Sequence, residues 1–123
     1  MMPRWLEILL TWTLFTAVMP AAAQQGGFPP ALRGLWAESP ITCDLLKRSP
    51  ANAPSNRSWV RITPETVSGT TSGRFVRALG PRSAQTTDDK LSTITIDFEL
   101  RRNGILFETV TGARASMQYA RCR

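Results

Sequence analysis

The segment LSTITIDFELRR, residues 91–102, constrains the fold more than any other stretch of this chain. Its apolar side chains stand two residues apart, at Ile94, Ile96, Phe98 and Leu100. Polar side chains occupy the alternate positions, at Thr93, Thr95, Asp97 and Glu99. A period of two is that of a β-strand with one face in a core and the other in water. We therefore predict a strand here, with Asp97 and Glu99 on its solvent face.

The strand runs directly into Asn103 and Gly104, a pair that tolerates positive φ and favours a two-residue hairpin turn. Counting outward from this turn predicts three cross-strand pairs, Arg102 with Ile105, Leu100 with Phe107, and Phe98 with Thr109. In this register the apolar side chains of the two strands lie on the same face of the hairpin. The register also sets Glu108 opposite Glu99 on the outer face, a like-charge pair that costs stability unless a neighbour relieves it.

Short segments of the same kind recur along the chain, separated by Gly, Pro and Asn. We expect further strands at 31–36, 59–63, 66–68, 74–79 and 115–122. Two polar loops are expected at 80–90 and at 44–58, the second opening with one helical turn at 44–48. This pattern predicts an all-β fold, a small antiparallel meander closing into a barrel or sandwich of about 6–8 short strands.

The N-terminus has the three regions of a secretory signal, because Arg4 precedes an apolar run and small residues precede Gln24. A membrane anchor is the alternative. However, the run of about 12 apolar residues falls short of the roughly 20 that span a bilayer, and Pro20 interrupts it. We expect a signal peptide at 1–23, a flexible N-terminal arm at 24–30 and a single β-barrel domain at 31–123. The protein would then be exported, periplasmic or secreted, with no stable membrane anchor.

Two cysteines, Cys43 and Cys122, allow one intramolecular disulfide, which would join the start of the domain to its end. A domain of about 100 residues has a modest core and often carries a covalent staple, which persists outside the reducing cytosol. We expect this bridge, since exposed free thiols are a liability outside the cell. Two free thiols, or a bridge between two chains, are the alternatives.

The composition argues against catalysis. The sequence has no histidine, which removes the commonest general base and zinc ligand, and with it catalytic triads and most metal hydrolase sites. A carboxylate pair drawn from Asp97, Glu99 and Glu108 would be the glycosidase option, but all three are expected in solvent. We therefore expect a protein that is not an enzyme, with no catalytic residues, no metal site and no cofactor.

The charge balance, 15 Lys plus Arg against 9 Asp plus Glu, bears on the partner. Most of the cations are arginines, which suit two-pronged capture of carboxylate or phosphate, so an anionic small ligand is one candidate. A merely solvated basic surface is the alternative. Nucleic acid is not expected, because the stretches that mix arginine with aromatic rings, 74–77 and 59–61, are brief. We expect a monomer.

Motifs at the two chain ends carry a resemblance. LRGLW near the start contains Gly34 and Trp36, and YARCR at the end contains Tyr119 and Arg121. Together they resemble the lipocalin and wider calycin signature, in which a G-x-W tryptophan closes one barrel end and a basic residue of the final strand lies over it. The resemblance implies that these four residues close the barrel or contact a ligand.

Two further resemblances concern function. The pattern L-x-G-x-W, a cysteine and a terminal Y-x-R-C is similar to small exported bacterial proteins of unassigned function, often with a central disulfide that this chain lacks. The segment LRGLWAESPITCD looks like the bacterial alkaline metalloproteinase inhibitor family, periplasmic barrels whose N-terminal arm, here 24–30, enters a protease cleft. That family closes a short local loop with its cysteine. We expect an exported non-catalytic binding protein with its ligand or partner unassigned, or alternatively a periplasmic protease inhibitor presenting its N-terminal arm.

Overall fold

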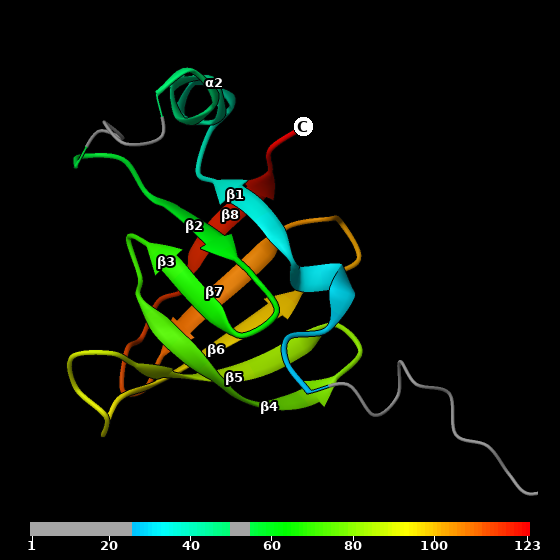
Figure 1. The fold of residues 1–123 in the computed structure, drawn as a ribbon, viewed down its shortest axis with the longest axis vertical. Helices are drawn as coiled ribbons and strands as arrows, with labels where there is room; N and C mark the ends of the chain where they lie inside the picture. The colour runs from blue at the N-terminus through cyan, green and yellow to red at the C-terminus, as the bar shows by residue number, and fades with distance from the viewer. Residues whose placement is uncertain (1–25, 50–54) are drawn as a thin grey trace, which may run out of the picture.

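The chain folds into a closed antiparallel barrel. The computed structural model describes residues 26–49 and 55–123, so the expected signal peptide at 1–23 lies outside the described residues. The described strands are β1 (Gly34–Ala37), β2 (Trp59–Ile62), β3 (Thr66–Gly69), β4 (Gly73–Gly80), β5 (Ser83–Asp88), β6 (Thr95–Leu100), β7 (Leu106–Val110) and β8 (Met117–Arg121). Each pairs antiparallel with the next, and β8 pairs back with β1 (Figure 1). The predicted all-β meander closing into a barrel is confirmed.

Inward side chains of these strands form one core. Trp36, Phe98 and Tyr119 are the largest strand residues in it, and none is more than 1% exposed. Smaller buried side chains surround them, at Val60, Ile62, Val67, Ala84, Ile96 and Leu106. Burial of apolar surface stabilises the fold by about 25 cal/mol per Å². An eight-stranded barrel is just wide enough for side chains to fill, and here the chain's own residues occupy the interior.

A turn precedes the first strand. Residues Pro30–Leu32 (η2) form a short 3₁₀ helix, and β1 begins only at Gly34. The strand predicted at 31–36 is therefore wrong in its first half. Proline lacks an N–H and has its φ near −65°, which suits the first position of a helical turn better than a paired strand. The turn carries Leu32 into the core, where it is fully buried.

Phe28 closes the barrel at the end where η2 lies. Its side chain is fully buried in the core, and its ring meets that of Phe75 edge-on, with centroids 5.1 Å apart. Its backbone N–H donates to the carbonyl of Pro64, in the turn between β2 and β3, at 2.8 Å. The arm expected at 24–30 therefore joins the barrel at Phe28.

The helix α2 (Pro40–Arg48) is longer than the single turn predicted at 44–48. The side chain of Ser39 accepts the N–H of Thr42 and caps the helix, and Pro40 occupies the first helical position. Serine followed by proline favours the start of a turn as well as the start of a helix, so this pair alone does not identify the helix. One helix face packs through Cys43 and Leu46 against β1, in a small cluster separate from the barrel core.

The segment predicted as a polar loop, 80–90, contains strand β5 instead. It pairs with β4 on one side and β6 on the other. Ala84 and Thr86 point inward and are fully buried. β-branched threonine suits a strand, and the neighbouring strands supply the large apolar side chains that this segment lacks. Pairing with β4 and β6 therefore makes this segment a strand, although its polar sequence predicts a loop.

The predicted register of the β6–β7 hairpin is wrong by one residue. The observed pairs are Leu100 with Leu106, Glu99 with Phe107, and Phe98 with Glu108. The N–H of Arg101 donates to the carbonyl of Ile105, so the loop holds residues 102–104 and not Asn103 and Gly104 alone. Gly104 takes the left-handed conformation, φ +83°, that completes such a three-residue loop.

This shift inverts the second strand of the hairpin. A slip of one residue turns every side chain to the opposite face of the sheet. Glu108, predicted in solvent beside Glu99, lies in the barrel interior and is only 3% exposed. The like-charge pair expected between the two glutamates does not form.

Candidate functional site

Trp36 and Arg121 meet where η2 leads into β1. The indole N–H of Trp36 donates to the carbonyl of Leu32 at 2.9 Å. Arg121 pairs with Trp36 across the β1–β8 seam, and its guanidinium carbon lies 4.2 Å from the centroid of the Trp36 ring. Such a contact contributes about 0.5–1 kcal/mol at an exposed site and about 2 kcal/mol when desolvated. The fold thus brings the motifs of the two chain ends into contact.

Arg121 also holds the turn before β1. Its Nη1 donates to the carbonyl of Arg33 at 2.8 Å and its Nη2 to the carbonyl of Ala31 at 2.7 Å. Gly34 lies against the same guanidinium, because a Cβ there would come 2.8 Å from Nη1, and its φ is +129°. Glycine is the residue that tolerates both conditions. The polar groups of this cluster are bonded to the chain itself, as in a structural plug.

Tyr119, which the end motif groups with Trp36 and Arg121, takes part in a different cluster. Its hydroxyl donates to Oε1 of Glu108 at 2.6 Å, and the hydroxyl of Thr71 donates to Oε2. A buried carboxylate is tolerated only where such donors satisfy it. Sequence reasoning missed this cluster because it placed Glu108 on the outer face. A three-residue loop at Gly104 is the signal that would have found it.

Burial raises the pKa of Tyr119 above its ordinary value, and its hydrogen bond to Glu108 raises that pKa further. The negative charges of Glu108 and of Glu38 act in the same direction. The phenol is therefore neutral at neutral pH and serves Glu108 as a hydrogen-bond donor. This cluster links β7 and β8 to Thr71 in the turn between β3 and β4.

The interior near β4 and β5 is tightly packed. A Cβ on Gly73 would lie 2.7 Å from the methyl carbon of Thr86, so glycine is needed for the two strands to approach. The hydroxyl of Thr86 is buried and has no hydrogen-bond partner within residues 26–49 and 55–123. A buried hydroxyl without a partner costs about 1–3 kcal/mol. Close packing of strands, rather than a built polar site, describes this part of the barrel.

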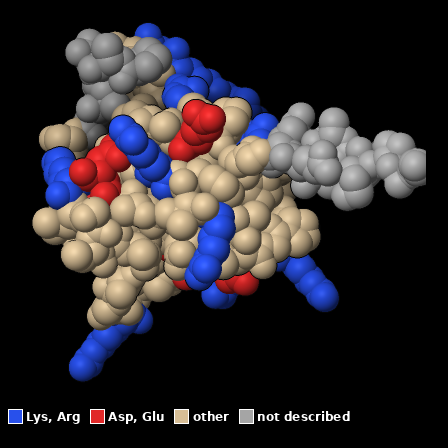
Figure 2. Space-filling view, turned by 60° about the horizontal axis from the view of Figure 1, so that its bottom comes forward, with Lys and Arg blue, Asp and Glu red and all other residues tan. Residues whose placement is uncertain are grey.

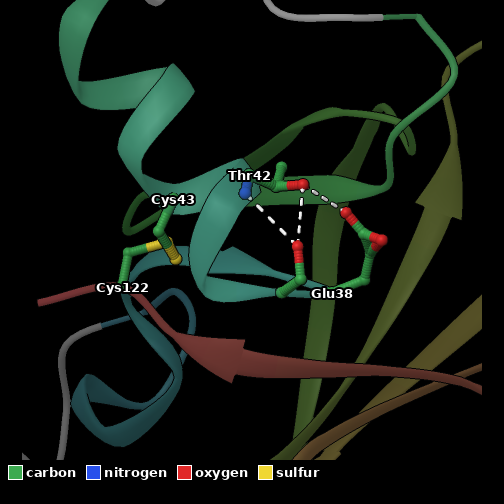
Figure 3. Close-up of a disulfide and its surroundings, with 5 residues drawn as sticks. Glu38, Thr42, Cys43 and Cys122 are labelled. Carbon is green, nitrogen blue, oxygen red and sulfur yellow. Dashed lines mark hydrogen bonds between the residues drawn. A yellow bond between two sulfur atoms is a disulfide. The ribbon is translucent and has the colours of Figure 1, made fainter.

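The predicted disulfide between Cys43 of α2 and Cys122 after β8 is present (Figure 3). It uses both cysteines of the sequence, which leaves none for the alternatives of free thiols or an interchain bridge. Beside it, the hydroxyl of Thr42 donates to Glu38 and bonds with the hydroxyl of Ser39. Thr42 is fully buried, so these bonds hold the start of α2 against the barrel.

The three carboxylates considered for acid–base chemistry are divided between two environments. Asp97 and Glu99 are exposed on the outer face of β6, and Glu99 pairs with Arg101 at 3.1 Å. Glu108 faces the interior. No group of three or more His, Cys, Asp or Glu side chains that could hold a metal ion occurs in the described part of the chain. The carboxylates therefore do not converge on one site.

The aromatic rings of the two arginine-containing stretches are occupied by packing. Phe75 lies against Phe28. Trp59 is half-buried and packs on the cluster formed by Ala37, Cys43 and Leu46. Stacking of nucleic-acid bases needs exposed ring faces next to the cations. These two stretches offer little free ring surface for it.

A hollow of about 310 Å³ lies beside the disulfide, between α2 and the end of β8. Its lining residues are Ser39, Pro40, Cys43, Asp44, Lys47, Ala120, Arg121 and Arg123. Three of them are cations and one is an acid, so the hollow is basic. It lies on the outside of the barrel and shares Arg121 with the closed end.

The comparisons with known proteins add no family to this description. No protein-family model matches the sequence, and neither a curated protein nor a solved structure gives a match. Among the described residues, no helix has the length and hydropathy needed to cross a bilayer. The fold and its closed end therefore define the class of the protein as a small disulfide-bonded antiparallel barrel.

Proposed function

We propose that this protein is an exported, non-catalytic binding protein that recognises another macromolecule with its outer surface. The observation that carries the proposal is the filled interior, in which Phe28, Trp36, Phe98 and Tyr119 are all buried. An eight-stranded barrel can be filled by side chains or can hold one small ligand, and here these side chains fill the interior. The disulfide agrees with export, since bridges of this kind persist outside the reducing cytosol.

The test starts from protein recovered from the exported fraction. We expect the intact mass of a chain that begins at Gln24, lighter by two hydrogens than the mass of the reduced form. Native mass spectrometry should then find no small molecule retained, while chemical cross-linking in the same fraction joins the outer surface to a macromolecule. One small molecule retained per protein molecule would overturn the proposal if its release changed the fluorescence of Trp36. The Trp59→Phe variant allows this fluorescence to be assigned to Trp36.

A protease inhibitor is the second candidate, supported by the way Phe28 is held. Its burial and its bond to Pro64 fix the point at which the arm leaves the barrel. A segment tethered to a rigid body loses less entropy on binding than a free one, which favours insertion into a cleft. The resemblance of the LRGLWAESPITCD segment to the metalloproteinase inhibitors agrees with this arrangement.

Two forms of the protein test the inhibitor proposal, one beginning at Gln24 and one at Gly27. Both retain Phe28, so we expect equal melting temperatures. Assayed against zinc metalloproteases and serine proteases, the longer form should inhibit a metalloprotease and the shorter form should not. Equal inhibition by both forms, or none against either class, would rule out an inhibitory arm.

A further inference from the structure

Strand β4 is longer than the neighbour that covers one of its edges. β3 pairs with β4 only at Arg74 and Gly73. The N–H of Phe75 then donates to the carbonyl of Glu65 at 2.9 Å, in the turn before β3. Past Phe75, no strand in the described ranges 26–49 and 55–123 pairs with this side of β4. Figure 1 shows β4 continuing along the lower rim of the barrel beyond β3.

Within this uncovered part of β4, the side chains of residues 76–79 are exposed. Val76 is 46% exposed and Leu79 is 49% exposed, an unusual degree for aliphatic residues in a strand. Arg77 is also exposed and makes no ion pair with a described residue. An edge with free backbone groups and apolar side chains is a template for another strand.

Charge decides which kind of strand fits. Arg77 is the cation within the uncovered edge. Arg74 lies just before the edge with its side chain 83% exposed, and it pairs loosely with Asp89 at 4.0 Å. Figure 2, which turns the lower side of Figure 1 forward, shows Lys and Arg side chains projecting from this face, with smaller groups of Asp and Glu among uncharged residues. A second copy of the chain, added antiparallel about a two-fold axis, would bring Arg77 near its own equivalent. Like charges in such positions oppose self-pairing.

We propose that the edge of β4 at residues 76–80 binds an extended acidic segment of a protein partner, which adds to the barrel as a short strand. The inference rests on the proposed function, because it names the partner class and the surface. Two bulges in the β4–β5 ladder, between Phe75 and Arg77 and between Ala78 and Gly80, bend this edge. They limit the added strand to a few residues and prevent long, unselective pairing.

Three synthetic peptides test the proposal: alternating Glu and Val, alternating Lys and Val, and alternating Glu and Pro. The Glu–Val peptide should bind best, and hydrogen exchange should slow at backbone amides between residues 76 and 80. The Lys–Val peptide tests charge. The Glu–Pro peptide keeps the charge, but its prolines fix φ near −65° and hold the peptide in a polyproline-like conformation that does not add to a sheet. Equal binding of either control peptide, or no binding of the Glu–Val peptide, would overturn the inference.

Matched variants complete the test. Arg77→Glu should weaken Glu–Val binding by about tenfold or more, and the loss should be largest at low salt. Arg114→Glu makes the same charge change in the loop before β8 and should leave binding nearly unchanged. If both variants bind equally well, the edge is not the site. If the peptide binds but no macromolecule is cross-linked, the proposed function is contradicted. If a macromolecule is cross-linked but the peptide does not bind, only the role of this edge is contradicted.

Discussion

Glu108 shows how one buried side chain organises the interior of this barrel. Its carboxylate accepts hydrogen bonds from Tyr119 on β8 and from Thr71 in the turn between β3 and β4. Desolvating a carboxylate costs several kcal/mol unless donors replace the lost water. The two hydroxyls supply that replacement, so three segments of the chain are held by one group.

Removal of this carboxylate tests its structural role. We expect Glu108→Ala to lower the free energy of unfolding by about 1–3 kcal/mol, because the hydroxyls of Tyr119 and Thr71 lose their acceptor and a cavity remains. Urea unfolding monitored by circular dichroism measures the change. Glu99→Ala, on the outer face of β6, is the matched control and should leave the unfolding midpoint unchanged. An equal loss in both variants would contradict the interior role of Glu108.

The raised pKa of Tyr119 predicts a dependence of stability on alkaline pH. Because the folded-state pKa lies above the unfolded value of about 10, this residue's contribution is complete below that pH. The contribution declines as the pH rises further, since the unfolded chain gives up the phenol proton first. Tyr119 is the only tyrosine in the sequence, so ultraviolet absorbance reports its ionisation directly. A midpoint near pH 10 in protein that is still folded would contradict the prediction.

At the scale of elements, the β6–β7 hairpin depends on the conformation of its loop. The carbonyl of Arg101 accepts the N–H of Gly104 at 2.9 Å, and Gly104 has a φ of +83°. A residue with a Cβ is disfavoured there. The loop length set by this glycine decides that Leu106 and Glu108 face inward.

Gly104→Ala should therefore destabilise the protein by about 1 kcal/mol or more, through backbone strain alone. A Cβ at Gly104 would meet no other atom within 4 Å, so crowding does not contribute. Gly26→Ala is the control, since Gly26 also has open space around it but no positive φ. Thermal unfolding of both variants measures the difference. Equal melting temperatures would show that the loop adapts without strain.

For the whole molecule, closure joins residues far apart in the sequence. β8 pairs with β1, and the disulfide links Cys43 to Cys122 across a sequence separation of 79 residues. Phe28 closes one end of the barrel from a position before the first strand. These contacts join the first and last strands at the seam, whereas no described strand covers the end of β4 beyond Phe75.

Reduction of the disulfide should lower the stability of the whole barrel. The chain-entropy model gives about 4 kcal/mol for a loop of this length. Urea unfolding with and without reductant measures the loss, and far-ultraviolet circular dichroism shows whether a β fold remains. The double variant Cys43→Ser, Cys122→Ser is the control, because its midpoint should match that of the reduced protein and not respond to reductant. An unchanged midpoint on reduction would contradict this role.

Much of the architecture follows from local pattern. The alternation along 91–102 predicts a strand, and the turn residues between short segments predict a meander. The end motifs predict contact of Trp36 with Arg121 only through a resemblance, and the fold provides that contact. The same reasoning does not find the strand within 80–90, because its inward residues Ala84 and Thr86 are too small or too polar to give an apolar alternation.

What the sequence alone determined is therefore the all-β class, the place but not the length of the turn at Asn103 and Gly104, and the single possible intramolecular disulfide. Period-two alternation and turn residues act over a few neighbours, so they can be read from the chain. Only the tertiary structure decided that Glu108 lies inside, that Phe28 closes the barrel and that β4 extends beyond its pairing with β3. Each of these depends on loop geometry or on partners distant in the sequence, where a shift of one residue exchanges the two faces of a strand.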